Sequence, residues 1–212
     1  MKKNIYSNIF LWLFVGLLIT FGTGMYFSTN ANAMKKIFST SYIFLLIAEI
    51  GIAIFLSARI GKMKPATARV LYILYTFLSG LTFSAIFVVY KLTSIMLVFG
   101  ITSVLFLVFA LIGKFTKIDL TKLGTYLFMI LIGVIISSII NAFVGNTTLD
   151  IILSAISIIV FLGFIAYDIK KIESLEGNIN DENLAIFGAF ELYLDFINIF
   201  IDLLRIFGDA RD

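Results

Sequence analysis

Seven long apolar runs, separated by short polar breaks, constrain the fold of this chain more than any other feature. They cover residues 9–27, 38–58, 70–90, 94–112, 123–143, 151–169 and 184–207. A helix needs about 20 apolar residues to cross a hydrocarbon core of roughly 30 Å. The runs are continuous and do not alternate in polarity as the strands of a membrane barrel do. The sequence therefore predicts seven transmembrane helices.

The overall composition is that of a chain that folds within a membrane. Of the 212 residues, 61% are hydrophobic and 14% are charged, whereas a soluble domain is about half apolar and about a quarter charged. One proline, Pro65, and 15 glycines leave no segment with the composition of a flexible linker. We therefore expect an all-α polytopic membrane protein, with residues 1–212 in a single integral membrane domain.

The N-terminus imitates a secretion signal. Lys2 and Lys3 precede an apolar run, and Ala31-Asn32-Ala33 resembles a small-residue cleavage site. The run is longer than the apolar core of about 7–15 residues that is typical of a signal, and further spans follow it. We expect the first span to be retained.

The chain contains no cysteine and no histidine. Disulfides, thiol catalysis, haem and zinc sites and imidazole acid–base chemistry are therefore excluded together. A net charge of +3, scattered along the chain, does not suggest nucleic-acid binding. We expect a protein that is not an enzyme and has no resident cofactor.

The positive-inside rule predicts the orientation. With the N-terminus inside, eleven of the 16 basic residues are cytoplasmic and five are not. The cytoplasmic set is Lys2, Lys3, Arg59, Lys62, Lys64, Arg69, Lys114, Lys117, Lys122, Lys170 and Lys171, and the other set is Lys35, Lys36, Lys91, Arg205 and Arg211. We expect a multi-pass protein of the cell membrane, with a cytoplasmic N-terminus and a C-terminus outside.

Ionisable residues within the spans are candidates for function, because a charge near the bilayer centre costs about 2.5–3.5 kcal/mol. The last span carries a stripe of polar residues spaced 4, 3, 4 and 3 apart: Glu191, Asp195, Asn198, Asp202 and Arg205. Such a stripe lies on one helix face and cannot face lipid. The last helix is therefore predicted to be the centre of a seven-helix bundle.

A structural role for these groups stays open at this stage. The stripe is also consistent with hydrogen bonds between helices and an end-of-span arginine that reaches the surface. Glu49 stands alone in the second span, where a protonated carboxyl bonded to a neighbouring helix is as consistent as a pore-lining group.

Asp168, near the end of the sixth span, is predicted to lie on a helix that continues past it. The helical alternation runs to Leu175, Gly177 supplies a stop, and Asn180 or Asp181 can cap the final helix. Asp168 and Asp195 then differ in height by roughly 7 Å, which helix tilt can remove. Their carboxylates can therefore meet across the hairpin.

These residues carry a resemblance to a known family. Tyr167-Asp168 ends the sixth span, and the last span reads Leu192-Tyr193-Leu194-Asp195-Phe196-Ile197-Asn198-Ile199-Phe200, followed by Leu203-Leu204-Arg205-Ile206-Phe207-Gly208. The pattern resembles the Bax inhibitor-1, or transmembrane Bax inhibitor motif, family in its bacterial YetJ-like branch. The similarity covers the whole topology, and its sharp motifs lie in the last two spans.

The resemblance implies a pH-sensitive calcium leak through a bundle around the last helix. It assigns Asp168 and Asp195 to a di-aspartyl proton sensor that contacts calcium transiently, and Arg59 to a latch on that pair. The partners are then calcium ions, protons and the lipid bilayer, with protein partners unknown. Glu191 and Asp202 depart from the family pattern, which has small or neutral polar residues there.

Two other classes of protein remain as alternatives. A membrane stress regulator or scaffold would act by protein interaction, and the sequence does not exclude it. An intramembrane aspartyl protease also needs two aspartates on adjacent spans, but Asp195 follows Tyr193-Leu194 instead of a Gly-x-Gly motif, and the chain lacks a Pro-Ala-Leu loop. A retinal protein is disfavoured because the last span contains no lysine for a Schiff base.

Overall fold

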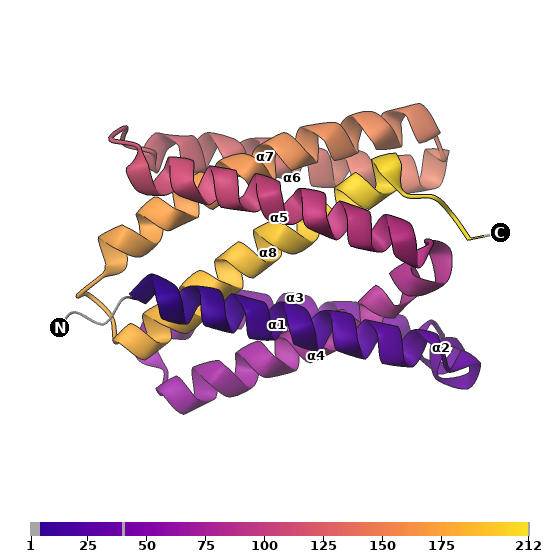
Figure 1. Ribbon diagram of the computed structural model, residues 1–212, viewed down its shortest axis with the longest axis horizontal. Helices are drawn as coiled ribbons and strands as arrows, with labels where there is room; N and C mark the ends of the chain where they lie inside the picture. Colours follow the sequence, from indigo (N-terminus) through magenta and orange to yellow (C-terminus); the bar gives the residue numbers. More distant parts are fainter. Residues whose placement is uncertain (1–4, 40, 212) are drawn as a thin grey trace. The chain divides into compact units, whose positions relative to one another are not determined.

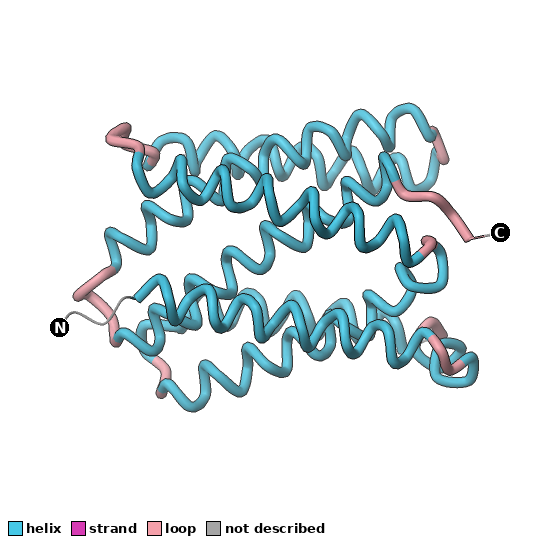
Figure 2. The backbone as a smooth tube through the Cα atoms, in the orientation of Figure 1, coloured by secondary structure: helices cyan, strands magenta, loops and turns pink. Residues whose placement is uncertain are grey.

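The computed structural model describes residues 5–39 and 41–211, and the regular elements in this part of the chain are all helices (Figures 1 and 2). They are α1 (Ile5–Ser28), α2 (Ala31–Ile37), α3 (Ser41–Arg59), the short 3₁₀ helix η1 (Ile60–Lys62), α4 (Pro65–Val89), α5 (Leu92–Phe115), α6 (Thr121–Val144), α7 (Thr147–Leu175) and α8 (Asp181–Phe207). Seven of the described helices are long and apolar enough to cross a membrane. The predicted fold class is confirmed.

Local sequence signals explain several helix ends. Pro65 occupies the first turn of α4, where its missing N–H costs nothing. Gly145 ends α6 with φ +73°, a left-handed conformation that glycine adopts without strain. Gly177 has φ +84° after α7, and the Asn180 Oδ1 accepts a hydrogen bond from the Glu182 N–H at the start of α8. The predicted stop and one of the predicted caps are confirmed.

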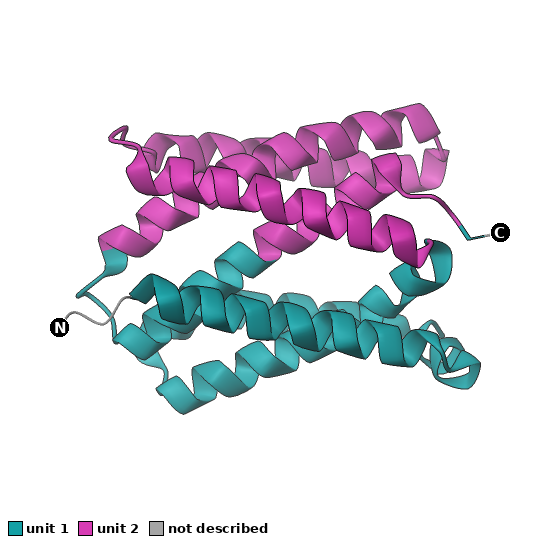
Figure 3. Ribbon diagram, viewed as in Figure 1, with its two compact units in different colours: residues 1–90, 175–193, 211–212 teal, residues 91–174, 194–210 magenta. Residues whose placement is uncertain are grey.

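The described residues fall into two compact units (Figure 3). Unit 1 contains the chain up to Tyr90 together with residues 175–193 and the C-terminal end, and unit 2 contains residues 91–174 and 194–210. The helix α8 contributes its first half to unit 1 and its second half to unit 2. The prediction of a single integral domain stays a prediction.

In unit 1, α1 packs against α4 through small residues and hydroxyls. A Cβ atom on Gly80 would lie 2.9 Å from the backbone oxygen of Thr20, so the two helices meet almost backbone to backbone. The Thr20 hydroxyl donates to the Thr76 carbonyl oxygen at 2.9 Å and lies 2.6 Å from the Tyr193 hydroxyl of α8. These contacts make the first span part of the packing of unit 1, and its retention stays a prediction.

In unit 2, glycines allow α5 and α6 to approach α7 closely. A Cβ atom on Gly113 would lie 2.7 Å from the Cα of Ala166, and one on Gly124 would lie 2.4 Å from the ring of Tyr167. Small residues at such crossings are typical of membrane helices, which associate through close packing. This packing fixes the part of α7 that carries Asp168.

The helix α8 is the most buried of the seven candidate spans. Inside its most apolar window 78% of the residues are buried, against 11% for α3 and α6 and 44% at most for the others. An almost wholly buried helix is surrounded by protein, whereas a mostly exposed apolar helix suits a lipid-facing position. The predicted central position of the last helix is confirmed.

Candidate functional site

The two aspartates of the predicted sensor, one on α7 and one on α8, are buried in unit 2. Asp168 is 3% exposed and Asp195 is 4% exposed. The Lys171 Nζ lies 4.0 Å from the Asp168 Oδ1, one helical turn further along α7, and 6.0 Å from the centre of the Tyr167 ring. The burial of two carboxyl groups costs free energy unless they are paired or protonated. Both predicted sensor residues are therefore buried, and their role as a sensor stays a prediction.

The observed helix ends set the register of the two aspartates. From Asp168 to the end of α7 at Leu175 there are 175 − 168 = 7 residues, and from the start of α8 at Asp181 to Asp195 there are 195 − 181 = 14. For parallel axes the heights would differ by about 10 Å. Contact between the two carboxylates requires inclined helices and stays a prediction.

Arg59, the predicted latch, is exposed at the end of α3 in unit 1. Arg59 is the residue directly before η1, and its carbonyl oxygen accepts a hydrogen bond from the Met63 N–H at 3.1 Å. The latch assignment stays a prediction from the resemblance.

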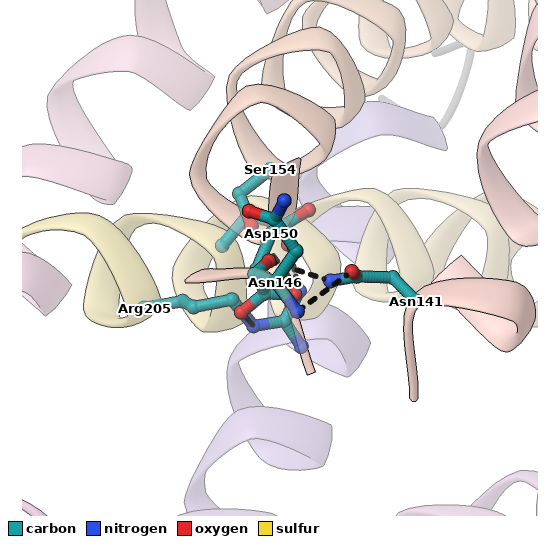
Figure 4. Close-up of polar contacts among 6 residues, drawn as sticks. Asn141, Asn146, Asp150, Ser154 and Arg205 are labelled. Atoms are coloured by element: carbon teal, nitrogen blue, oxygen red, sulfur yellow. Dashed lines mark hydrogen bonds and ion pairs between the residues drawn. The ribbon is translucent and has the colours of Figure 1, made fainter. Parts of the chain in front are cut away.

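A second group of charged residues lies in unit 2, near the C-terminal end of α8. The Arg205 Nη1 lies 3.2 Å from the Asp202 Oδ1 and donates to the Ser154 Oγ at 3.1 Å, and the Arg205 Nε lies 3.5 Å from the Asp150 Oδ2 (Figure 4). The side chains of Arg205 and Asp150 are 39% and 42% exposed, while that of Asp202 is 10% exposed. We name these four residues the Arg205 cluster.

The Arg205 cluster borders a polar cleft of about 380 Å³ where α6 turns into α7. The Asn141 Nδ2 donates to the Asn146 carbonyl oxygen at 3.0 Å, and the Asn146 N–H donates back to the Asn141 Oδ1 at 3.2 Å (Figure 4). The Asn146 Oδ1 also accepts a hydrogen bond from the Leu149 N–H, so it caps α7. The side-chain amides thus hold the turn that places Asp150 beside Arg205.

Sequence reasoning did not select Asp150 and Ser154 as site residues. Asp150 lies in the first turn of α7, where a carboxylate is expected for interaction with the helix dipole. The available signal was the spacing of four residues between Asp150 and Ser154, which places two polar groups on one face of a span. Their common partner, Arg205, is more than 50 residues away in the sequence and could not be identified from that spacing.

The remaining candidates have polar partners on neighbouring helices or within their own helix. In unit 1, the Thr82 hydroxyl donates to the Glu49 Oε1 at 3.2 Å, and the Ser57 hydroxyl donates to the Glu191 Oε1 at 3.1 Å. The Asn198 Nδ2 donates to the carbonyl oxygen of Leu194 one turn earlier at 2.7 Å. The first two contacts match the interhelical hydrogen bonding that the sequence left open for Glu49 and the stripe, whereas the Asn198 bond lies within α8.

The predicted stripe on α8 is largely withdrawn from the exterior. Asp195 and Asp202 are buried, Glu191 and Asn198 are intermediate, and only Arg205 at the end is exposed. The structure therefore keeps the stripe inside protein and brings its last members together in the Arg205 cluster. Glu191 belongs to unit 1, while the other four belong to unit 2.

A seven-span apolar bundle with buried carboxyl groups on its last two helices defines a polytopic α-helical membrane protein. Residues 2–212 match the family described as Inhibitor of apoptosis-promoting Bax1. The chain belongs to this family, which is the Bax inhibitor-1 family that its last two spans resemble.

Individual relatives match this chain over most of its length. The inner membrane protein YbhL of Escherichia coli K12 is 39% identical over 214 residues, which cover 97% of this chain and 91% of that protein. An uncharacterized protein of Borreliella burgdorferi is 35% identical over 218 residues, covering 100% of this chain and 94% of its own. An uncharacterized membrane protein of Streptococcus pyogenes serotype M1 is 37% identical over 161 residues, covering 74% and 70%. The names of the first and third state a membrane location, in agreement with the multi-pass prediction.

Proposed function

We propose that this protein is a pH-sensitive calcium leak channel of the cell membrane, in which Asp168 and Asp195 form the proton sensor. The observation that carries the proposal is the burial of both carboxyl groups within one unit, on the two helices that hold the family's sharp motifs. Calcium requires oxygen ligands, which such residues supply. The chain's lack of histidine leaves carboxyl groups as natural proton acceptors for a sensor.

The proposed gate follows from charge. Two carboxylates close together in a low-dielectric site cannot both ionise cheaply, so they share a proton and titrate as a coupled pair. In the deprotonated state the pair attracts the guanidinium of Arg59 and the pathway is closed. Acidification adds a proton, weakens that attraction and increases the open population.

The test is calcium flux into dye-loaded proteoliposomes made from the purified protein, measured between about pH 6 and 8, a range in which a shared proton of a buried carboxyl pair is exchanged. We expect flux to rise on acidification in the wild type, and Asp168→Asn and Asp195→Asn to lose that pH response. Arg59→Ala should raise the flux at neutral pH.

Asp119→Asn is the matched control, because it makes the same chemical change at a fully exposed carboxylate in the α5–α6 loop. It should keep the wild-type pH profile. No flux through the purified wild type would overturn the channel and favour a scaffold that acts by protein interaction. A full pH response in both aspartate variants of the sensor would overturn the sensor assignment.

The proposed orientation places the N-terminus in the cytoplasm. Lys2 and Lys3, which contribute to the basic asymmetry, lie outside the described residues. Because the chain has no cysteine, Ser28→Cys and Thr116→Cys give single labelling sites at the ends of α1 and α5. A membrane-impermeant maleimide should label position 28 but not position 116 in intact cells, and the reverse pattern would invert the orientation.

A further inference from the structure

The connection between α3 and α4 presents three exposed cations within six residues: Arg59, Lys62 and Lys64. None of the three forms an ion pair with a carboxylate in the described part of the chain. The next basic residue, Arg69, is already paired with Glu182 of α8. Since α3 and α4 are consecutive candidate spans, the connection lies at a membrane surface. We name residues 59–64 the basic turn.

The shape of the basic turn is fixed by α8. Asn183, which is 3% exposed, donates through its Nδ2 to the carbonyl oxygens of Ile60 at 2.8 Å and Met63 at 2.9 Å. A Cβ atom on Gly61 would lie 3.2 Å from the Ile179 side chain, so the backbone passes close to the segment before α8. One buried amide therefore holds both ends of the turn, and the lysines extend from a rigid backbone.

The start of α4 adds a second attraction for anions. Lys64 precedes Pro65 in an extended conformation and provides no side-chain cap. The first N–H groups of a helix have no partner within the helix and carry a partial positive charge. The exposed apolar side chains of Phe55 and Val70 flank the turn on α3 and α4. Cations, helix N–H groups and apolar surface thus occur together at one site.

We propose that the basic turn binds the phosphate headgroup of an anionic phospholipid, with Lys62 and Lys64 as the main contacts. A headgroup phosphate meets the lysines and the start of α4, while its acyl chains lie against the apolar surface of the two spans. Two acidic residues, Asp181 and Glu182, directly precede Asn183 in the sequence. Glu182 forms an ion pair with Arg69. Arg59 belongs to the turn and is also the latch of the calcium leak proposed above, whereas Lys62 and Lys64 have no role in that leak.

The experiment titrates the purified protein, in a neutral detergent, with dioleoyl phosphatidylglycerol and counts bound lipid by native mass spectrometry. Each lysine near an anionic surface contributes roughly a fivefold change in affinity. We therefore expect Lys62→Gln with Lys64→Gln to weaken binding by about 25-fold when both contributions add. Asn183→Ala should also weaken binding although it removes no charge, because it removes the hydrogen bonds that hold the basic turn.

Lys117→Gln with Lys122→Gln is the matched control, since it removes two exposed lysines, one from the α5–α6 loop and one from the first turn of α6, where Asp119 provides a compensating charge. An equal loss in this control would overturn the proposal in favour of diffuse attraction. Binding of dioleoyl phosphatidylcholine as tight as that of phosphatidylglycerol would also overturn it. Inorganic phosphate that displaces the lipid at equal concentration would assign the site to free phosphate instead. The exposed positions of Lys62 and Lys64 allow the double variant to fold, and its thermal unfolding serves as the check.

Discussion

The buried aspartates and the Arg205 cluster, both in unit 2, hold charge in an apolar bundle in different ways. At the Arg205 cluster, a guanidinium lies within 3.5 Å of two carboxylates and is itself 39% exposed. At Asp168, the Lys171 Nζ lies 4.0 Å from the Oδ1, and the carboxyl group is almost fully buried. The cluster therefore pairs its charges at a partly exposed position, whereas Asp168 and Asp195 hold their carboxyl groups in the buried interior.

This difference agrees with a structural role for the Arg205 cluster and with the sensing role proposed for the two aspartates. A partly exposed ion pair is worth about 0–1 kcal/mol, because water and salt screen it. The protonation of a buried carboxyl group depends more strongly on its surroundings than that of an exposed one. We therefore expect proton-dependent behaviour to depend on Asp168 and Asp195 and the helix-end packing to depend on Arg205.

The largest effect is expected for Asp195→Leu. The substitution removes one carboxyl of the proposed pair, so the pH response of calcium flux should disappear, and an apolar side chain in a buried polar position should disturb the packing of α8. Ile199→Leu, one turn further on the same helix, keeps the apolar volume and should cost less than about 1.5 kcal/mol. Flux at several pH values and thermal unfolding would compare the two. Equal and small effects would show that the stripe is not central to gating.

The next effect concerns the packing that positions Asp168. Gly113→Ala places a methyl group against the backbone of Ala166, and overpacking of this kind costs typically about 1–3 kcal/mol. Gly133→Ala is the control, because a Cβ atom there meets nothing within 4 Å. Thermal unfolding in detergent should show a lower midpoint for the first variant only. A tolerated Gly113→Ala would contradict the close contact between α5 and α7.

A smaller effect is expected for Arg205→Gln. The change leaves Asp150 and Asp202 without their shared cation, and after screening the loss of stability should be about 1 kcal/mol. Asp202→Asn combined with Arg205→Gln should lose less than the sum of the two single variants, because the residues interact directly. A thermodynamic cycle of thermal unfolding measures this coupling. Strict additivity would show that the observed ion pair contributes nothing.

The smallest effect is expected at Asp119, whose side chain accepts a hydrogen bond from the Thr121 N–H at 2.9 Å. Hydrogen bonds from the Thr121 side chain and N–H lower the pKa of the Asp119 carboxyl below its ordinary value of 3.8. A lowered pKa gives stability that is present above the unfolded-state value and is lost as pH falls through the folded-state value. Asp119→Ala should therefore be slightly less stable at neutral pH and equal to the wild type in strong acid. A stability difference that persists in acid would contradict this origin.

Much of the fold could be predicted because its signals are local. The apolar runs fixed the number of spans, and the continuation of α7 to Leu175 followed from buried Ile169 and Ile172 before Gly177. The short helix α2 was not predicted, because seven residues give too little periodicity and its cap is a single Asn30 contact. The second span begins at Ser41 instead of residue 38, since Phe38 ends α2.

Of the candidate site, only the buried carboxyl groups could be predicted from the sequence. Charge in an apolar span identified Asp168, Asp195 and Asp202, but not their partners. The hydroxyl of Ser57 is 134 residues from Glu191, and Ser154 is 51 residues from Arg205. Such partners depend on the rotation and crossing of helices, which a hydropathy pattern does not specify.

The hydrogen bond between Thr20 and Tyr193 has a consequence for the order in which the protein is made. It joins the first and last spans across 173 residues, so α1 leaves the ribosome long before its partner on α8 exists. Until then, the Thr76 carbonyl oxygen of α4 is the one of these two partners that the Thr20 hydroxyl can reach. Contacts so distant in sequence form late. Biogenesis therefore leaves α1, α3 and α4 as an incomplete assembly that closes when residues 175–193 arrive, and a chain stopped after α6 would lack the segment that completes its own first half.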